Sequence, residues 1–219
     1  MNKMRQLLAG GTLMLVAASM QAAEISGNVT LASDYVYRGV SQTTEEATIQ
    51  GGFDVAADNG AYVGVWGSNV DFDGSVEIDF YLGFSNDIFE GLTYDVGVIH
   101  YDYPNQPAGQ MDSNFQELYL NLTYSAFTVG LAHSSDFFGE TGSATYAYGE
   151  YEFSLPNDFS LVLHYGSQGI DEGQGYDEYS MTLSKELAGI DFSLGWHDTD
   201  VNSVDIMGSR IVFALSKSL

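Results

Sequence analysis

Apolar and polar side chains alternate along most of the chain. Between residues 76 and 85 the even-numbered positions are Val, Ile, Phe and Leu, whereas the odd-numbered positions are Glu, Asp, Tyr, Gly and Ser. The same alternation recurs over residues 117–124, 159–166 and 190–196. Because successive side chains of a β-strand point to opposite faces, this pattern indicates strands with one apolar and one polar face. No stretch shows a comparable helical period, so we expect few helices.

Twelve segments of this kind follow one another along the chain. An even number of antiparallel strands is typical of a transmembrane barrel whose strands run up and down. Short turns alternate with longer loops rich in Gly and acids, as in outer-membrane barrels with short periplasmic turns and longer extracellular loops. The predicted strands cover residues 24–37, 47–57, 61–69, 75–85, 92–103, 114–124, 127–135, 144–155, 159–167, 176–187, 190–198 and 208–219. The predicted longer loops cover residues 38–46, 70–74, 104–113, 136–143, 168–175 and 199–207.

Alternation alone is also compatible with a soluble β-sandwich, because it shows only that one face of each strand is apolar. Three features favour the membrane barrel. The polar face carries acids, Tyr and Gly in nearly every strand, and the aromatic residues gather toward strand ends, as in an interfacial girdle. The last strand places Ile211, Phe213, Leu215 and Leu219 on one face. We therefore predict an all-β fold, a transmembrane antiparallel barrel of about twelve strands.

The N-terminal segment has the features of a secretory signal peptide. Lys3 and Arg5 precede an apolar run over residues 7–18, and the small residues Ala22 and Ala23 follow. A membrane anchor is the alternative, but this run is shorter than the roughly 20 residues that a spanning helix needs. The sequence therefore predicts a signal peptide cleaved after residue 22 and a single barrel domain over residues 23–219.

The net charge and the absence of Cys exclude several classes of function. The chain of 219 residues has a formal net charge of −24 and contains no Cys. With so few cations it is not expected to bind the phosphate backbone of nucleic acid. The absence of Cys excludes disulfides, thiolate zinc sites and thiol nucleophiles. Beyond the signal peptide the cations are Arg38, Lys185, Arg210 and Lys217.

A barrel of twelve strands falls between small barrels filled by side chains and large barrels with aqueous channels, so it should enclose a narrow lumen. Strand parity places many carboxylates on the inward face, and a ring of carboxylates in a confined wall concentrates cations and repels anions. The candidate pore-lining residues are Asp34, Arg38, Asp54, Glu77, Asp79, Asp95, Glu117, Glu150, Glu152, Asp191 and Arg210.

The two arginines in this set allow two interpretations. Arg38 and Arg210 are expected at the outer ends of the first and last strands, which must pair to close the barrel. Facing Glu117, Glu77 and Asp79 across the mouth, they would create a transverse electric field. Alternatively, each arginine neutralises nearby lumen carboxylates and helps to close the seam.

Histidine and loop residues offer little support for catalysis or metal binding. Parity points His164 and His197 inward but His100 and His133 outward, so the four are not expected to share a metal. A lipid hydrolase would need a Ser and a His on the lipid-facing side, and the neighbours His133 and Ser134 point to opposite faces. The acidic loops near residues 71–74 and 171–173 do not match a full calcium-binding loop. We therefore expect no enzyme activity, no cofactor and no metal.

Four runs of the sequence resemble one family. These are residues 34–42 (DYVYRGVSQ), 49–54 (IQGGFD), 64–70 (GVWGSNV) and 77–81 (EIDFY). Together they resemble the TorF-type porin family, formerly described as conserved proteins of unknown function, and the resemblance extends over the whole chain. It implies an outer-membrane barrel with channel activity.

The function predicted from the sequence is a narrow, cation-preferring diffusion channel for small polar solutes or ions in the outer membrane of a Gram-negative bacterium. The expected partners are outer-membrane lipid and lipopolysaccharide, the barrel-assembly machinery that reads the C-terminal strand, and the small polar solutes or cations themselves. The alternatives are a plugged structural or adhesive barrel and, less favoured, an outer-membrane lipid hydrolase. The short loops and the Gly-rich polar walls favour the open lumen.

Overall fold

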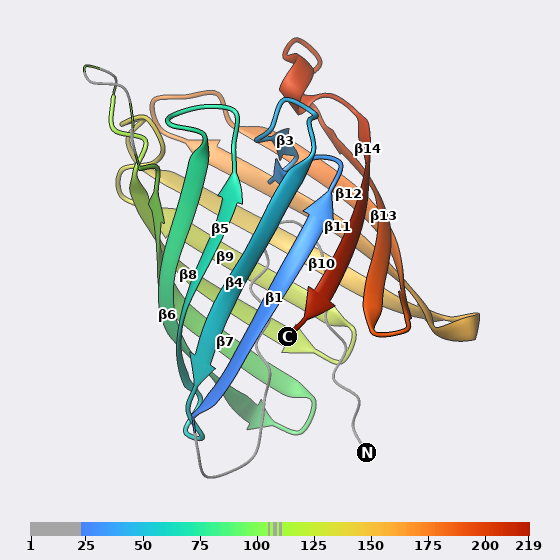
Figure 1. Ribbon diagram of the computed structural model, residues 1–219. Coiled ribbons are helices and arrows are strands. Elements are labelled where there is room, and N and C mark those ends of the chain that lie inside the picture. Colours follow the sequence, from blue (N-terminus) through green and yellow to red (C-terminus); the bar gives the residue numbers. More distant parts are fainter. Residues whose placement is uncertain (1–22, 105, 107–108, 110) are drawn as a thin grey trace.

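A computed structural model describes residues 23–104, 106, 109 and 111–219. Twelve strands form a closed antiparallel barrel (Figure 1). These strands are β1 (Glu24–Ala32), β4 (Thr48–Ala56), β5 (Ala61–Asn69), β6 (Val76–Phe89), β7 (Leu92–Asp102), β8 (Phe115–Tyr124), β9 (Phe127–Ser134), β10 (Ala144–Leu155), β11 (Phe159–Ile170), β12 (Tyr176–Leu187), β13 (Ile190–Thr199) and β14 (Arg210–Ser218). The predicted barrel and its strand number are confirmed.

The barrel closes between its first and last strands. On one side β1 pairs with β4 over its whole length, from Glu24 opposite Ala56 to Ala32 opposite Thr48. On the other side β1 pairs with β14, with Asn28 opposite Ser218. All other neighbours are consecutive strands, so no strand of the barrel has a free edge.

Helical structure is sparse in the described residues. It consists of two 3₁₀ turns, η1 (Pro156–Asp158) and η2 (Asp205–Met207). No helix in this part of the chain is long and apolar enough to span a bilayer. The predicted signal peptide, residues 1–22, lies outside the described residues.

The outer face of the barrel carries a band of exposed apolar side chains. Phe53 is 60% exposed, Leu82 57% and Leu118 62%. The register places Val63, Leu82 and Val98 next to one another across β5, β6 and β7. A contiguous apolar surface of this extent is unfavourable in water and suits a hydrocarbon environment.

Two strands are longer than the sequence pattern predicts. β6 continues to Phe89 and leaves a short turn at residues 90–91, and β11 continues to Ile170. The β11 extension pairs fully with β10, and the β6 extension pairs with β7 across a register shift between Asp87 and Phe89. Both extensions run through residues with a weak apolar alternation. Backbone pairing therefore sets the ends of these strands more than side-chain pattern does.

The first strand is shorter than predicted, and this is the main correction to the predicted fold. Residues 24–37 were expected to form one strand, but β1 ends at Ala32. The chain then forms a hairpin from β2 (Val36–Tyr37) and β3 (Val40–Ser41), which pair only with each other. Instead of an external loop over residues 38–46, the chain places this hairpin inside the ring of strands, at the end where the long loops lie (Figure 1). Asp34 and Arg38 therefore belong to the hairpin and not to a barrel strand.

Candidate functional site: the lumen and its hairpin

The hairpin is built by a tight turn and an acidic brace. Arg38 and Gly39 occupy its tip with φ of 47° and 79°, as two-residue turns that match strand twist require. At its base Asp34 Oδ1 accepts hydrogen bonds from Ser41 Oγ at 2.6 Å and Thr43 Oγ1 at 2.8 Å. These bonds hold both arms of the hairpin together.

The Arg38 side chain reaches across the lumen to the opposite wall. Its two terminal nitrogens donate to the two carboxylate oxygens of Glu117 on β8 at 2.9 and 2.7 Å, and one also donates to Gln168 on β11 at 2.9 Å. The guanidinium carbon lies 4.1 Å from the ring centre of Tyr146 and 4.7 Å from that of Tyr37. The paired side chains are only 9% and 2% exposed. A two-point carboxylate contact with aromatic faces is among the strongest arrangements for a guanidinium group.

Two tyrosines of the hairpin contact the wall formed by β5, β6 and β7. Tyr35 donates to Glu77 on β6 at 2.7 Å, and its ring lies 5.4 Å from the Trp66 ring on β5. The Tyr37 ring lies 5.9 Å from the Tyr101 ring on β7.

The tip and base of the hairpin meet the remaining strands. A Cβ on Gly39 would lie 2.6 Å from Thr199 Cγ2 on β13 and 2.8 Å from Glu178 Cβ on β12. Asp34 Oδ2 lies 3.6 Å from Arg210 on β14. The hairpin thus contacts β5 to β8 on one side and β10 to β14 on the other, and it crosses the mouth of the barrel.

These contacts change the electrostatic prediction for the mouth. Arg38 was expected beside Arg210, facing Glu117 across an open mouth; instead it binds Glu117 directly, while Arg210 lies against Asp34. The transverse field is therefore replaced by two local pairs. The reason is the inward fold of residues 33–43, which the strand pattern did not reveal.

Burial affects the protonation of the hairpin groups. Burial, followed by the nearby charge of Glu77, raises the pKa of Tyr35 well above its usual value, so this phenol donates its hydrogen bond as a neutral group. Burial acts to lower the pKa of Arg38, but contacts with Tyr37 and Glu117 outweigh it and the pKa is raised. Arg38 therefore remains a cation at any physiological pH.

Two acids beneath the hairpin form no salt bridge with any Lys or Arg of the described residues. Glu77 is 1% exposed and accepts from Tyr35, and Asp79 is 5% exposed. Asp79 Oδ1 has no hydrogen-bond partner among the described residues. Arg38 pairs with Glu117, so the carboxyl groups of Glu77 and Asp79 lie on this wall without a salt bridge among the described residues.

A second cluster of charged groups surrounds His164 on β11. Its Nδ1 lies 2.9 Å from Glu150 on β10, and its Nε2 lies 2.7 Å from Glu178 on β12. Tyr146 donates to Glu178 as well. Because Glu178 also contacts the hairpin tip, this cluster forms part of the surface on which the hairpin rests.

Tyrosines on the β5 to β10 wall lie flat over glycines of neighbouring strands. Tyr81 is directly opposite Gly64, and Tyr62 is directly opposite Gly83. A Cβ on either glycine would clash with the ring that covers it. Tyr119 covers Gly97 and Tyr148 covers Gly130 in the same way. Flat rings occupy less of the lumen than rings that project inward.

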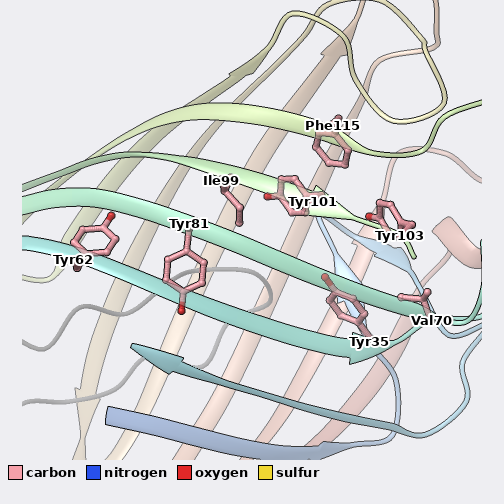
Figure 2. Close-up of a cluster of buried hydrophobic side chains, with 8 residues drawn as sticks. All are labelled: Tyr35, Tyr62, Val70, Tyr81, Ile99, Tyr101, Tyr103 and Phe115. Atoms are coloured by element: carbon pink, nitrogen blue, oxygen red, sulfur yellow. The ribbon is translucent and has the colours of Figure 1, made fainter. Parts of the chain in front are cut away.

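The hydroxyls of these tyrosines bind inward-facing acids. Tyr81 donates to Asp54 and Tyr62 donates to Asp95, each at 2.5 Å. Figure 2 shows the buried cluster along this wall, from Tyr62 and Tyr81 to Tyr101 and Phe115. The opposite wall carries small polar side chains instead: Thr30, Ser180, Thr182, Ser193 and Ser216 are buried there.

We predict that Gly64→Ala lifts the Tyr81 ring off the wall and breaks its bond to Asp54. Overpacking of this kind costs about 1–3 kcal/mol. Thermal unfolding of the folded barrel should therefore occur at a lower temperature. Gly149→Ala is the matched control, because a Cβ there meets only Phe127 and Thr128 at 3.9 Å. Equal unfolding temperatures for the two variants would contradict the packing role.

The remaining predicted residues are distributed along the lumen. Glu152 accepts from Ser160 at 2.6 Å, near the short-turn end, and Asp191 is half-buried on β13. The described residues contain no group of three or more His, Asp or Glu side chains placed to hold a metal ion. The sequence analysis did not identify Gln168, Glu178 or the tyrosine hydroxyls as site groups. For Glu178 the sequence pattern could have done so, because Glu178, Ser180 and Thr182 alternate along β12 on its inward face.

Comparisons with known proteins agree with the barrel. A family model described as a bacterial protein of unknown function (Gcw_chp) matches residues 16–218. No curated protein sequence matches the chain.

Among solved structures, the KdgM porin has a TM-score of 0.60 at 8% identity, with 89% of this chain and 99% of that chain covered. A KdgM porin in complex with disordered oligogalacturonate has the same TM-score and identity, with 89% of this chain and 98% of that chain covered. The NanC porin has a TM-score of 0.56 at 9% identity, with 88% and 98% covered. At these identities the similarity shows a shared porin fold.

Proposed function

Since the chain belongs to the Gcw_chp family of bacterial proteins of unknown function, we propose that it is an outer-membrane channel for the passive diffusion of small polar solutes or ions, with a preference for cations. The observation that carries this proposal is a closed barrel with an apolar outer band and an inner face of acids, hydroxyls and glycines. We also propose that the chain is a porin of the TorF type and that residues 1–22 are a cleaved signal peptide.

The charge of the lumen supports the cation preference. Glu77 and Asp79 lie buried beneath the hairpin without a cation of their own, and Asp54 and Asp95 face the lumen below them. Carboxylates in a confined wall attract cations. Oligogalacturonate, present in one KdgM porin complex, is a polyanion, and this acidic lumen does not suit it. We therefore propose neutral and cationic solutes for this chain.

The plugged structural barrel remains the second candidate, and the hairpin across the mouth is the observation that favours it. Liposome swelling separates the two. Liposomes that contain the folded protein should swell in glycine or glycerol faster than protein-free liposomes, and heat-unfolded protein should give no increase. Swelling at the protein-free rate, with the folded barrel present, would contradict the channel.

A further inference from the structure

The hairpin is attached to the barrel mainly through side chains. Its strands β2 and β3 pair only with each other, and Asp71 N to Gln42 O is a backbone bond from the hairpin to a neighbouring loop. The hydrogen bonds from Ser41 and Thr43 to Asp34 hold the two arms of the hairpin in a fixed arrangement. The following segment contains Thr44 and Glu45, both exposed and with positive φ of 51° and 63°. The hairpin is joined to β1 through Ser33, which is hydrogen-bonded to Phe213 on β14, and to β4 through the exposed segment. Rotation about these two links would move it as one body.

The wall groups around Arg38 form a binding site for a guanidinium or ammonium group. Glu117 offers both carboxylate oxygens, Gln168 offers an amide oxygen, and Tyr146 offers a ring face at 4.1 Å. We call these three residues, from β8, β11 and β10, the cation cage. A carboxylate, an amide oxygen and an aromatic face are the groups that recognise organic cations.

Resting on the proposed channel function, we propose that the cation cage is a solute-binding site that Arg38 occupies from within the chain. A solute with a guanidinium or primary ammonium group competes with Arg38 for the cage. When the solute takes the cage, the hairpin loses its strongest attachment and swings away from the mouth. Arg38 thus acts as a built-in competitor, and the hairpin is a lid that cationic solutes open.

The charge around the cage favours exchange by a cation over simple release of Arg38. While the hairpin covers the mouth, loss of Arg38 without a replacement would leave Glu117 buried without a cation, which is costly. An incoming cation removes that penalty. A neutral solute of the same shape does not, so the site selects for charge.

The first test measures agmatine binding by calorimetry on the folded protein in detergent, so it does not depend on conduction. Arg38→Ala, which empties the cage, should bind agmatine at least tenfold more tightly than the wild type. The double variant Arg38→Ala with Glu117→Gln should lose that gain in affinity. N-butylurea, a neutral analogue of agmatine, should bind neither variant. Equal agmatine affinity in the wild type and both variants would overturn the proposal. If Arg38→Ala does not fold, Arg38→Gln replaces it with the same expectation.

A second test locks the lid. The chain contains no Cys, so Gly39→Cys with Thr199→Cys introduces one disulfide between the hairpin tip and β13, where a Cβ at position 39 would lie 2.6 Å from Thr199 Cγ2. The reduced double variant should bind agmatine, and the oxidised one should bind it at least tenfold more weakly. The same protein before and after reduction is its own control for strain at position 39. Equal binding in both states would overturn the lid. Agmatine binding without liposome swelling would instead refute the channel and leave the cage intact.

Discussion

Replacing Arg38 by Ala is expected to raise the single-channel conductance several-fold. The closed hairpin depends on the buried pair between Arg38 and Glu117. Removal of one partner of a buried pair costs on the order of 3–5 kcal/mol, because the other charge stays buried alone. The loss destabilises the closed position of the hairpin and not the barrel, because the hairpin strands are not hydrogen-bonded to the strands of the barrel. The population with an open mouth should therefore increase.

Planar-bilayer recordings of Arg38→Ala and wild type under identical salt measure this effect. Lys217→Ala is the matched control, because Lys217 is an exposed cation that binds Gly189 O at the opposite end of the barrel. Its conductance should equal that of the wild type. Unchanged conductance in Arg38→Ala, with wild-type folding, would mean that the hairpin does not limit passage.

Replacing Glu77 by Gln and Asp79 by Asn together is expected to abolish most of the cation preference. These acids are buried beneath the hairpin, where a confined wall strengthens their effect on passing ions. The amides keep the size of the side chains and remove the charge. Burying a neutral amide costs less than burying a carboxylate, so folding should survive. The cation-to-anion permeability ratio, read from the reversal potential across a KCl gradient, should fall several-fold.

Asp158→Asn provides the control for this second prediction. Asp158 lies exposed in the η1 turn, outside the lumen, and carries the same type of charge. Its removal should leave the permeability ratio unchanged. A ratio that stays at the wild-type value in the Glu77 and Asp79 double variant would show that other groups set the selectivity.

The sequence predicts the strands and their faces well, because alternation depends on residue type alone. It does not predict the hairpin. Residues 33–37 keep only part of the alternation of β1, since Ser33 falls on its apolar face and Val36 on its polar face, but they contain no Gly or Pro that would mark the end of a strand. The chain leaves the barrel there because Asp34 accepts hydrogen bonds from Ser41 and Thr43. Such bonds between side chains do not appear in the alternation of apolar and polar residues.

The candidate site was predictable in composition but not in its contacts. Parity places Arg38, Glu117 and the acids of β6 on polar faces, yet the bond from Arg38 to Glu117 joins residues 79 positions apart in sequence. The flat tyrosines depend on register, which sets Tyr81 opposite Gly64. Register follows from pairing along the whole barrel and not from any single segment.

The measurement that tests the central claim most directly is the single-channel current of the purified wild-type protein in a planar bilayer, with the reversal potential read across a KCl gradient. We expect discrete current steps and a cation-selective reversal potential. Agmatine on the side of the long loops should increase the fraction of time that the channel spends open. A folded barrel that gives no steps, with or without agmatine, would contradict the channel.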